Sequence, residues 1–344
     1  MSVDLRVMAA ALGALFCTTV QAAAPDAIDL PTAQAQAQLL DMLEKESLHR
    51  DRVEWPALRS RLKAAQNDPA KARAVLQEAI GRSSGGHGSW ISAKQLQAKA
   101  ERLARTNGAA TPAMGAAIAS AGALDPRIGR VDIGGYSVMQ GPAAHQQMKE
   151  RAQRWQAIIR DQDNGSHCGW IVDLRGNTGG NMWPMLLGAA PLLRTTPRAD
   201  ENVGSFATAD GPSLWQLTPS SVRLGERVRV DLGGPGYQLK RPGAPVAVLT
   251  GPRTASSGEA TVLSFRGRPQ TRSFGQPTSG LSTANVMRSL VDGSALLLTT
   301  TVMHDRNGQG DGLKIEPDQY TEGDAATLAA AQQWLLAQPA CQAH

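Results

Sequence analysis

Thr254-Ala255-Ser256-Ser257-Gly258-Glu259 is a run of small and polar residues between two apolar segments. A strand-like run, 246–250, precedes it, and a helix-like run, 259–263, follows it. This order predicts a strand, a tight turn and a helix that begins near Ser256. The first N–H groups of a helix lack intrahelical partners, and the helix dipole favours negative charge there. Ser256 is therefore either a helix cap or a nucleophile whose attack builds an oxyanion.

Four further motifs accompany this turn along the chain. They are the strand and Gly-rich loop Ile171–Gly180 upstream, and the segments Gly275–Gly280, Val291–Gly293 and Ile315–Asp318 downstream. In this order and spacing the motifs resemble the C-terminal-processing peptidase family, which includes the tail-specific proteases and the tricorn core. The resemblance covers roughly residues 126–320 and, more loosely, the region around His87.

Hydrophobic periodicity predicts an α/β fold with a mixed sheet and a small N-terminal helical domain. Residues 30–82 and 94–107 have helical spacing, and the Ala/Gly-rich segment 108–122 is expected to be a linker. From residue 128 onward strands alternate with helices, which is typical of α/β proteins. The expected strands are 128–133, 170–174, 246–250 and 295–302, and the expected helices are 143–160, 182–193, 258–266 and 324–337.

The organisation predicted from these patterns has three parts. Residues 1–24 form a signal peptide, residues 25–110 the helical domain with the His87 loop, and residues 111–344 the peptidase core. The resemblance implies that this core is ClpP/crotonase-like. The Gly-, Pro- and Ser-rich stretch 194–244 is expected to be a long connection with short strand-like pieces.

The N-terminus predicts export. An apolar run, 7–20, follows Arg6 and ends in small residues, and it is too short to span a bilayer. The mature protein is expected in the periplasm or outside the cell, without stable membrane insertion. Two cysteines then remain, Cys168 and Cys341, and in an oxidising compartment they are expected to form a disulfide. Two unrelated thiols are the alternative.

Composition and motifs exclude several other classes of protein. The net charge of +5 is spread thinly, and no basic cluster with interleaved aromatics suggests nucleic-acid binding. The sequence has no phosphate-binding loop, dinucleotide fingerprint or metal-ligand spacing. No cofactor and no metal are therefore expected, and the expected partner is a peptide or an unfolded protein.

The family that these motifs resemble has two branches, which differ in the residue that serves as general base. Processing proteases place a lysine directly after the last glycine of the Gly275–Gly280 motif, but this chain has Leu281 there. The other branch, typified by tricorn, uses a histidine from the N-terminal part of the catalytic unit. His87, in the loop Ser83–Trp90, resembles that base, and no PDZ-like insert follows before residue 128. An ordinary histidine pKa then predicts an acid limb of activity at about pH 6 to 7.

The same resemblance implies the remaining members of the site. Its orienting acid lies seven residues before Asp318, which is Asp311 here, and its nucleophile lies three residues before Glu259, which is Ser256 rather than Ser257. The oxyanion hole would use backbone N–H groups of Ser257 and of Gly179 or Gly180, because glycine permits close approach of substrate. Asp173, Arg175, Glu316 and Asp318 are expected to be structural.

Two functions of different class follow from these residues. The first is an exported serine peptidase that acts through Ser256, His87 and Asp311. The second is a catalytically degenerate relative that keeps the fold and binds a peptide or an apolar ligand. The missing lysine, the glycines on both sides of His87 and the Asp at position 311 favour the second.

Overall fold

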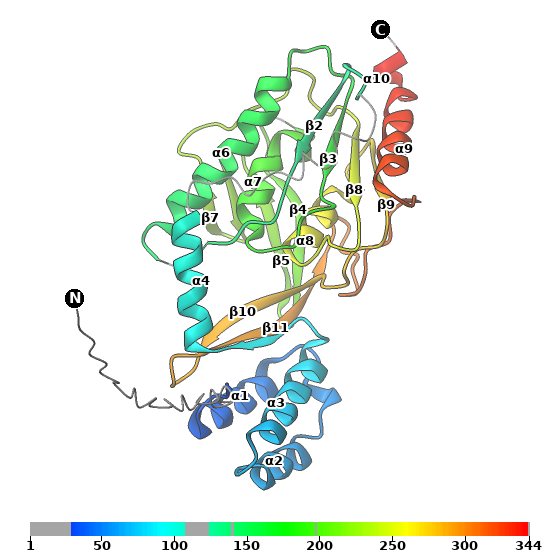
Figure 1. Ribbon diagram of the computed structural model, residues 1–344. Coiled ribbons are helices and arrows are strands. Elements are labelled where there is room, and N and C mark those ends of the chain that lie inside the picture. Colours follow the sequence, from blue (N-terminus) through cyan, green and yellow to red (C-terminus); the bar gives the residue numbers. More distant parts are fainter. Residues whose placement is uncertain (1–28, 107–123, 139–140, 197, 343–344) are drawn as a thin grey trace, which may run out of the picture.

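The computed structural model describes residues 29–106, 124–138, 141–196 and 198–342, and its centre is a five-stranded parallel sheet (Figure 1). The strand order is β12-β9-β8-β3-β2. These strands are β2 (Ile128–Asp132), β3 (Gly169–Asp173), β8 (Val246–Thr250), β9 (Thr271–Gly275) and β12 (Gln319–Tyr320). The expected signal peptide and the expected linker at 108–122 lie outside the described residues.

Both faces of the parallel sheet are covered, because successive strand residues point to opposite sides. Ile171 and Leu249 pack on one side with α9 (Asp324–Leu336), which α10 (Pro339–Gln342) follows. Val172 and Val248 pack on the other side with α6 (Ala144–Gln162), α7 (Met182–Leu193) and α8 (Ser257–Phe265). Figure 1 shows α9 on the side of the sheet opposite α6 and α7. The mixed α/β fold expected from the sequence is thus present.

A second, antiparallel sheet completes the core. Its strands are β1 (Ser89–Ile91), β4 (Glu201–Thr208), β5 (Gly211–Leu217), β6 (Ser221–Leu224), β7 (Arg227–Asp231), β10 (Thr283–Ser289) and β11 (Ala295–His304). The order is β1-β11-β4-β5-β6-β7, and β10 also pairs with β11. The short strand-like pieces expected within 194–244 are present as β4 to β7, but they pair with one another instead of lying in a long connection. Short strands joined by tight turns form a meander there, and Trp215, Leu217 and Val222 from it are buried in the core.

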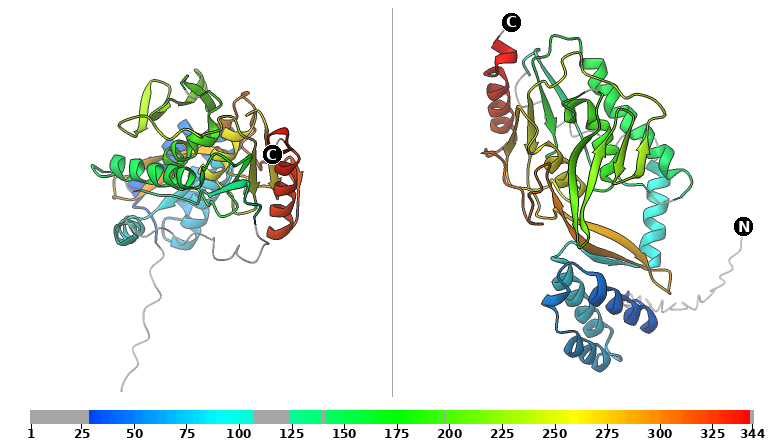
Figure 2. Two further views of the ribbon diagram at one scale, coloured as in Figure 1. Left: turned by 90° about the horizontal axis from the view of Figure 1, so that it is seen from above. Right: turned by 180° about the vertical axis from the view of Figure 1, so that it is seen from behind.

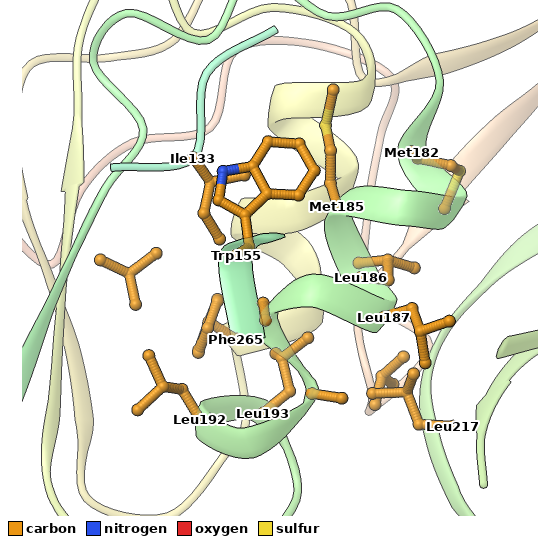
Figure 3. Close-up of a cluster of buried hydrophobic side chains, with 14 of the residues drawn as sticks. Ile133, Trp155, Met182, Met185, Leu186, Leu187, Leu192, Leu193, Leu217 and Phe265 are labelled. Atoms are coloured by element: carbon orange, nitrogen blue, oxygen red, sulfur yellow. The ribbon is translucent and has the colours of Figure 1, made fainter. Parts of the chain in front are cut away.

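Helix α7 is the centre of the main apolar core. Every one of its residues is buried, and it packs against α6, α8 and strands β5 to β7. A helix that is apolar on all sides requires such an enclosed position. Figure 3 shows part of this cluster, with side chains of α7 near Trp155, Phe265 and Leu217. Within the described residues, no helix is both long enough and apolar enough to cross a membrane.

The N-terminal helices form a separate bundle on the antiparallel sheet. The bundle consists of α1 (Ala33–Glu46), the short 3-10 helix η1 (Arg50–Arg52), α2 (Trp55–Ala64) and α3 (Pro69–Ser84). Side-chain oxygens of Thr32 and Asp68 cap α1 and α3. The apolar cluster of the bundle continues into Leu296 and Leu298 of β11. Figure 2 shows the bundle beyond β10 and β11, away from the parallel sheet.

One further helix and a disulfide complete the fold. After β1 the chain forms α4 (Ala93–Thr106), which rises from the β10–β11 ribbon toward α6 (Figure 1). At the other end of the molecule a disulfide joins Cys168, just before β3, to Cys341 in α10, with a Cα–Cα distance of 4.9 Å. This is the cysteine pair that the sequence predicts, and it fixes the C-terminal helices to the parallel sheet.

Candidate active site

Ser256 lies in the turn between β8 and α8, where the sequence places a strand–turn–helix. Its backbone has φ 52° and ψ −113°, a conformation that residues other than glycine rarely adopt. Hydrogen bonds hold the turn from both sides. The N–H of Ala255 donates to the carbonyl of Asn177 over 2.9 Å, and the N–H of Ser256 donates to Glu259 Oε2 over 2.7 Å.

Glu259 is fully buried and ties the Ser256 turn to the following loop. Besides Ser256, its carboxylate accepts from the Thr278 hydroxyl over 2.5 Å and from the N–H groups of Gly280 and Leu281, each over 2.9 Å. Burial raises the pKa of Glu259, while the four hydrogen bonds oppose that rise. Since all four neighbours donate, the ionised carboxylate is the form that fits them. The backbone N–H of Leu281 thus faces the Glu259 carboxylate.

His87 is held in place by the ends of two elements. Helix α3 ends in a left-handed Gly85, with φ 62°, and Gly86 also has a positive φ, 87°. Strand β1 then begins at Ser89, which pairs with Leu297 of β11. Between them the carbonyl of His87 accepts from Asn285 Nδ2 over 3.1 Å. The glycines before His87 therefore supply the tight turn that carries its ring toward the core.

The structure brings Ser256 and His87 together. His87 Nε2 lies 3.1 Å from Ser256 Oγ, and Nδ1 on the other side of the ring lies 2.7 Å from Thr283 Oγ1. Burial lowers the pKa of His87 to about 4 because a buried site disfavours the charged ring. At neutral pH the ring is therefore uncharged and can accept a proton on one nitrogen.

Asp311 is not at this ring, and its expected orienting role is wrong for this geometry. Its side chain is exposed and accepts from the N–H of Leu313 over 2.9 Å. The neighbouring Gly312, not Asp311, faces the site, because a Cβ on it would lie 3.0 Å from Thr283 Cγ2. Thr283 was missed because its contact with His87 joins residues 196 positions apart and belongs to no local motif.

The backbone donors near Ser256 differ from the expectation at one position. The N–H of Gly179 donates to Asn177 Oδ1 over 2.9 Å, so it is already engaged within the chain. Ser257 is the first residue of α8, where a backbone N–H has no intrahelical acceptor, and its hydroxyl donates to the carbonyl of Gly180 over 2.9 Å. The N–H groups of Ser257 and Gly180 thus remain as the candidate oxyanion donors.

Positions 179 and 180 require glycine because neighbouring atoms lie too close for a Cβ. A Cβ on Gly179 would lie 2.9 Å from the carbonyl oxygen of Ala255 and 3.0 Å from Ser256 Cβ. One on Gly180 would lie 2.0 Å from the carbonyl oxygen of Tyr136. Both also have positive φ, 92° and 123°. The Gly-rich loop therefore packs directly under the Ser256 turn.

The remaining acidic and basic motif residues have structural contacts. Arg175 bridges Asp173 and Asp324, over 2.6 and 2.7 Å. Asp318 accepts from the backbone and hydroxyl of Ser273, and the side chain of Glu316 is exposed. Among the described residues, no group of three or more His, Cys, Asp or Glu side chains could hold a metal ion.

Comparison with known sequences identifies relatives of this site. Residues 143–321, more than half of the chain, match the model of peptidase family S41. The nisin-resistance protein of Lactococcus lactis subsp. lactis is 34% identical over 178 residues, which are 50% of this chain and 51% of that protein. The chain thus spans about half the length of this curated relative.

Solved structures share the fold over nearly the whole chain. A lipoprotein from Streptococcus agalactiae is 25% identical, with a TM-score of 0.65, and the match covers 89% of this chain and 97% of that one. The photosystem II D1 C-terminal processing protease is 12% identical, with a TM-score of 0.57, and the match covers 91% and 99%. The second likeness is one of fold alone. Because the family model matches more than half of the chain, the chain belongs to peptidase family S41.

Proposed function

We propose that this protein is a serine peptidase that hydrolyses peptide bonds with Ser256 as the nucleophile and His87 as the general base. The observation that carries the proposal is the 3.1 Å separation of His87 Nε2 and Ser256 Oγ, at a strained turn that opens a helix. A serine hydroxyl needs a base within this reach, and a helix N-terminus suits the charge that its attack creates. Membership of a peptidase family supports the same reaction.

In the proposed reaction Nε2 of His87 acts first as the base and then as the acid. Nε2 takes the Ser256 proton while Oγ attacks the substrate carbonyl carbon, and the N–H groups of Ser257 and Gly180 bind the resulting oxyanion. The protonated ring then gives its Nε2 proton to the leaving amine, which breaks the peptide bond and leaves an ester on Ser256. Water, deprotonated by the same nitrogen, hydrolyses that ester and restores the enzyme.

We further propose that the protein acts outside the cytoplasm on peptides or unfolded proteins. The apolar run at 7–20 and the disulfide between Cys168 and Cys341 support export, because disulfides persist in oxidising compartments. The family supports peptide or protein substrates. The name of the Lactococcus lactis relative makes nisin one substrate to include in a peptide panel.

Labelling with a fluorophosphonate probe, together with hydrolysis of the peptide panel, tests the assignment. We expect the wild-type protein and Ser257→Ala to be labelled and to cleave, with less than about a tenfold loss in Ser257→Ala, because it loses a single neutral hydrogen bond. Ser256→Ala should lose both properties while it keeps its thermal midpoint. Absence of labelling and cleavage in the folded wild-type protein would instead support the degenerate, ligand-binding relative.

A further inference from the structure

The ring nitrogen of His87 that faces away from Ser256 meets a hydroxyl rather than a carboxylate. Thr283 Oγ1 lies 2.7 Å from Nδ1, and Thr283 is only 5% exposed. In the described part of the chain, no carboxylate forms a hydrogen bond or ion pair with this ring, whose side-chain partners are Thr283 and Ser256. The position that an acid occupies in a Ser-His-Asp arrangement is thus held by a neutral oxygen.

Thr283 is held rigidly in this position. It is the first residue of β10 and pairs with Val302 of β11. The residue before it, Ser282, donates its hydroxyl to the carbonyl of Leu313 over 2.6 Å. The Thr283 methyl group lies against Gly312, where a Cβ would approach it to 3.0 Å. Since a β-branched side chain has few χ1 rotamers, packing of the methyl group determines where Oγ1 points.

A hydroxyl can either donate to Nδ1 or accept from it, and the reaction distinguishes the two. When Nε2 takes the Ser256 proton, both ring nitrogens carry hydrogen, and Nδ1–H needs an acceptor. Thr283 Oγ1 can serve only as that acceptor in this state. In the resting state the same direction, Nδ1–H to Oγ1, leaves the Nε2 lone pair facing Ser256 Oγ, whereas the opposite direction puts a hydrogen between them.

We propose that Thr283 is a positioning residue that accepts the Nδ1–H of His87 and so holds the tautomer and ring orientation that Ser256 activation requires. This inference rests on the proposed peptidase function. A neutral partner orients the ring without adding the attraction of a negative charge. The low pKa of His87, about 4, has burial as its cause and agrees with such a partner.

The first test measures the ring directly, without catalysis. Two-bond ¹H–¹⁵N correlation spectra of histidine-labelled protein distinguish Nδ1–H from Nε2–H rings, and His87→Gln identifies the His87 signals. We expect the Nδ1–H form in wild type and in Thr283→Ser, and a changed tautomer ratio in Thr283→Val. An Nε2–H ring in wild type, or the same ratio in wild type and Thr283→Val, would overturn the proposal. This result stands even if the protein proves inactive.

The second test uses kinetics with matched variants. Thr283→Val should lower kcat by about 10- to 100-fold with little change in KM, and Thr283→Ser should restore most of it, because one orienting hydrogen bond is lost and regained. Thr301→Val, on the adjacent strand β11, should leave activity unchanged. Equal activity of Thr283→Val and wild type would overturn the role of Thr283 but not that of Ser256.

A charged replacement gives a third readout that a merely structural role would not move. In Thr283→Asp a carboxylate faces Nδ1 and favours the protonated ring, so the acid limb of kcat/KM should move up by about one pH unit or more. Thr283→Asn, which is similar in size and neutral, should not move it upward. An unchanged limb in Thr283→Asp would show that residue 283 does not face the base and would overturn the proposal.

Discussion

The strained backbone conformation of Ser256 depends on a neighbouring glycine, Gly179. Its positive φ of 52° is costly for a serine, typically about 1–3 kcal/mol, and persists because the surroundings determine it. Gly179 provides part of those surroundings, since its backbone lies under the turn with no room for a Cβ. The resemblance implies Gly179 or Gly180 as an oxyanion donor, whereas in the structure the position of Gly179 allows the turn to form.

Gly179→Ala should therefore disable the site without destroying the fold. The added Cβ would meet Ala255 and Ser256 and would also be strained at φ 92°. We expect kcat/KM to fall by about 100-fold or more, because a displacement of about 1 Å at a catalytic centre costs that much. Gly134→Ala is the matched control, since nothing lies within 4 Å of its Cβ position. Similar activity of both variants would contradict this account.

The pH dependence of activity follows from the burial of His87. The neutral ring is the base, so activity is lost when the ring gains a proton. Because burial lowers its pKa to about 4, kcat/KM should stay level from neutral pH down to about pH 5 and fall below that. This replaces the limb at about pH 6 to 7 that an unperturbed histidine predicts. A pH–rate profile, with an unfolding check at each pH, decides between them.

At the scale of elements, the N-terminus of α8 is the junction of the site. Glu259, in the first turn of α8, accepts from Ser256 and from the loop at 278–281, and that loop leads directly into β10 and Thr283. One buried carboxylate thus connects the element that carries the nucleophile with the element that contacts the base. A helix N-terminus also favours its negative charge.

Glu259→Gln should weaken both the fold and the site. The amide group places N–H donors against backbone donors, which leaves buried groups unpaired at a cost of about 1–3 kcal/mol. We expect a lower thermal midpoint and a lower kcat, measured by calorimetry and peptide hydrolysis. Glu316→Gln, at an exposed carboxylate, should change neither. A thermal midpoint equal to that of wild type would count against the proposed junction.

At the scale of the whole molecule, the disulfide secures the C-terminal helices. Cys168 and Cys341 are 173 residues apart, so the bridge closes a very long loop. In the chain-entropy model such a bridge stabilises the folded state by about 3–5 kcal/mol. Cys168→Ala/Cys341→Ala should therefore unfold at lower denaturant concentration. Ser256 and His87 lie on other elements, so this double variant should retain its activity at denaturant concentrations below its unfolding transition.

Alkylation of the unreduced protein checks the bridge itself. Mass spectrometry should find both cysteines protected until a reductant is added. Alkylation of both Cys168 and Cys341 before reduction would mean that the bridge does not form. Wild-type stability in the double alanine variant would mean that it forms without securing α9 and α10.

Local pattern was enough for the main elements of the core. The periodicity of the chain predicts the strands at 128–133 and 246–250 and the helices at 182–193 and 324–337, and the structure has elements at these positions. Periodicity suffices there because the length and apolar spacing of each segment match one type of element. Within 194–244 the periodicity indicates short strand-like pieces but not their pairing into the meander at 201–231, because a local window does not contain cross-strand pairing.

By itself the sequence predicts an α/β core with a mixed sheet, the strand–turn–helix at Ser256 and a pairing of the two cysteines, because motifs, periodicity and composition express these locally, while the family resemblance points to His87. Only the tertiary structure decided that Thr283, not Asp311, faces His87, that Gly179 is engaged by Asn177, and that burial lowers the pKa of His87. Each of these depends on contacts between distant segments. Such contacts determine the distances between side chains and their exposure to solvent, and a local stretch of sequence specifies neither.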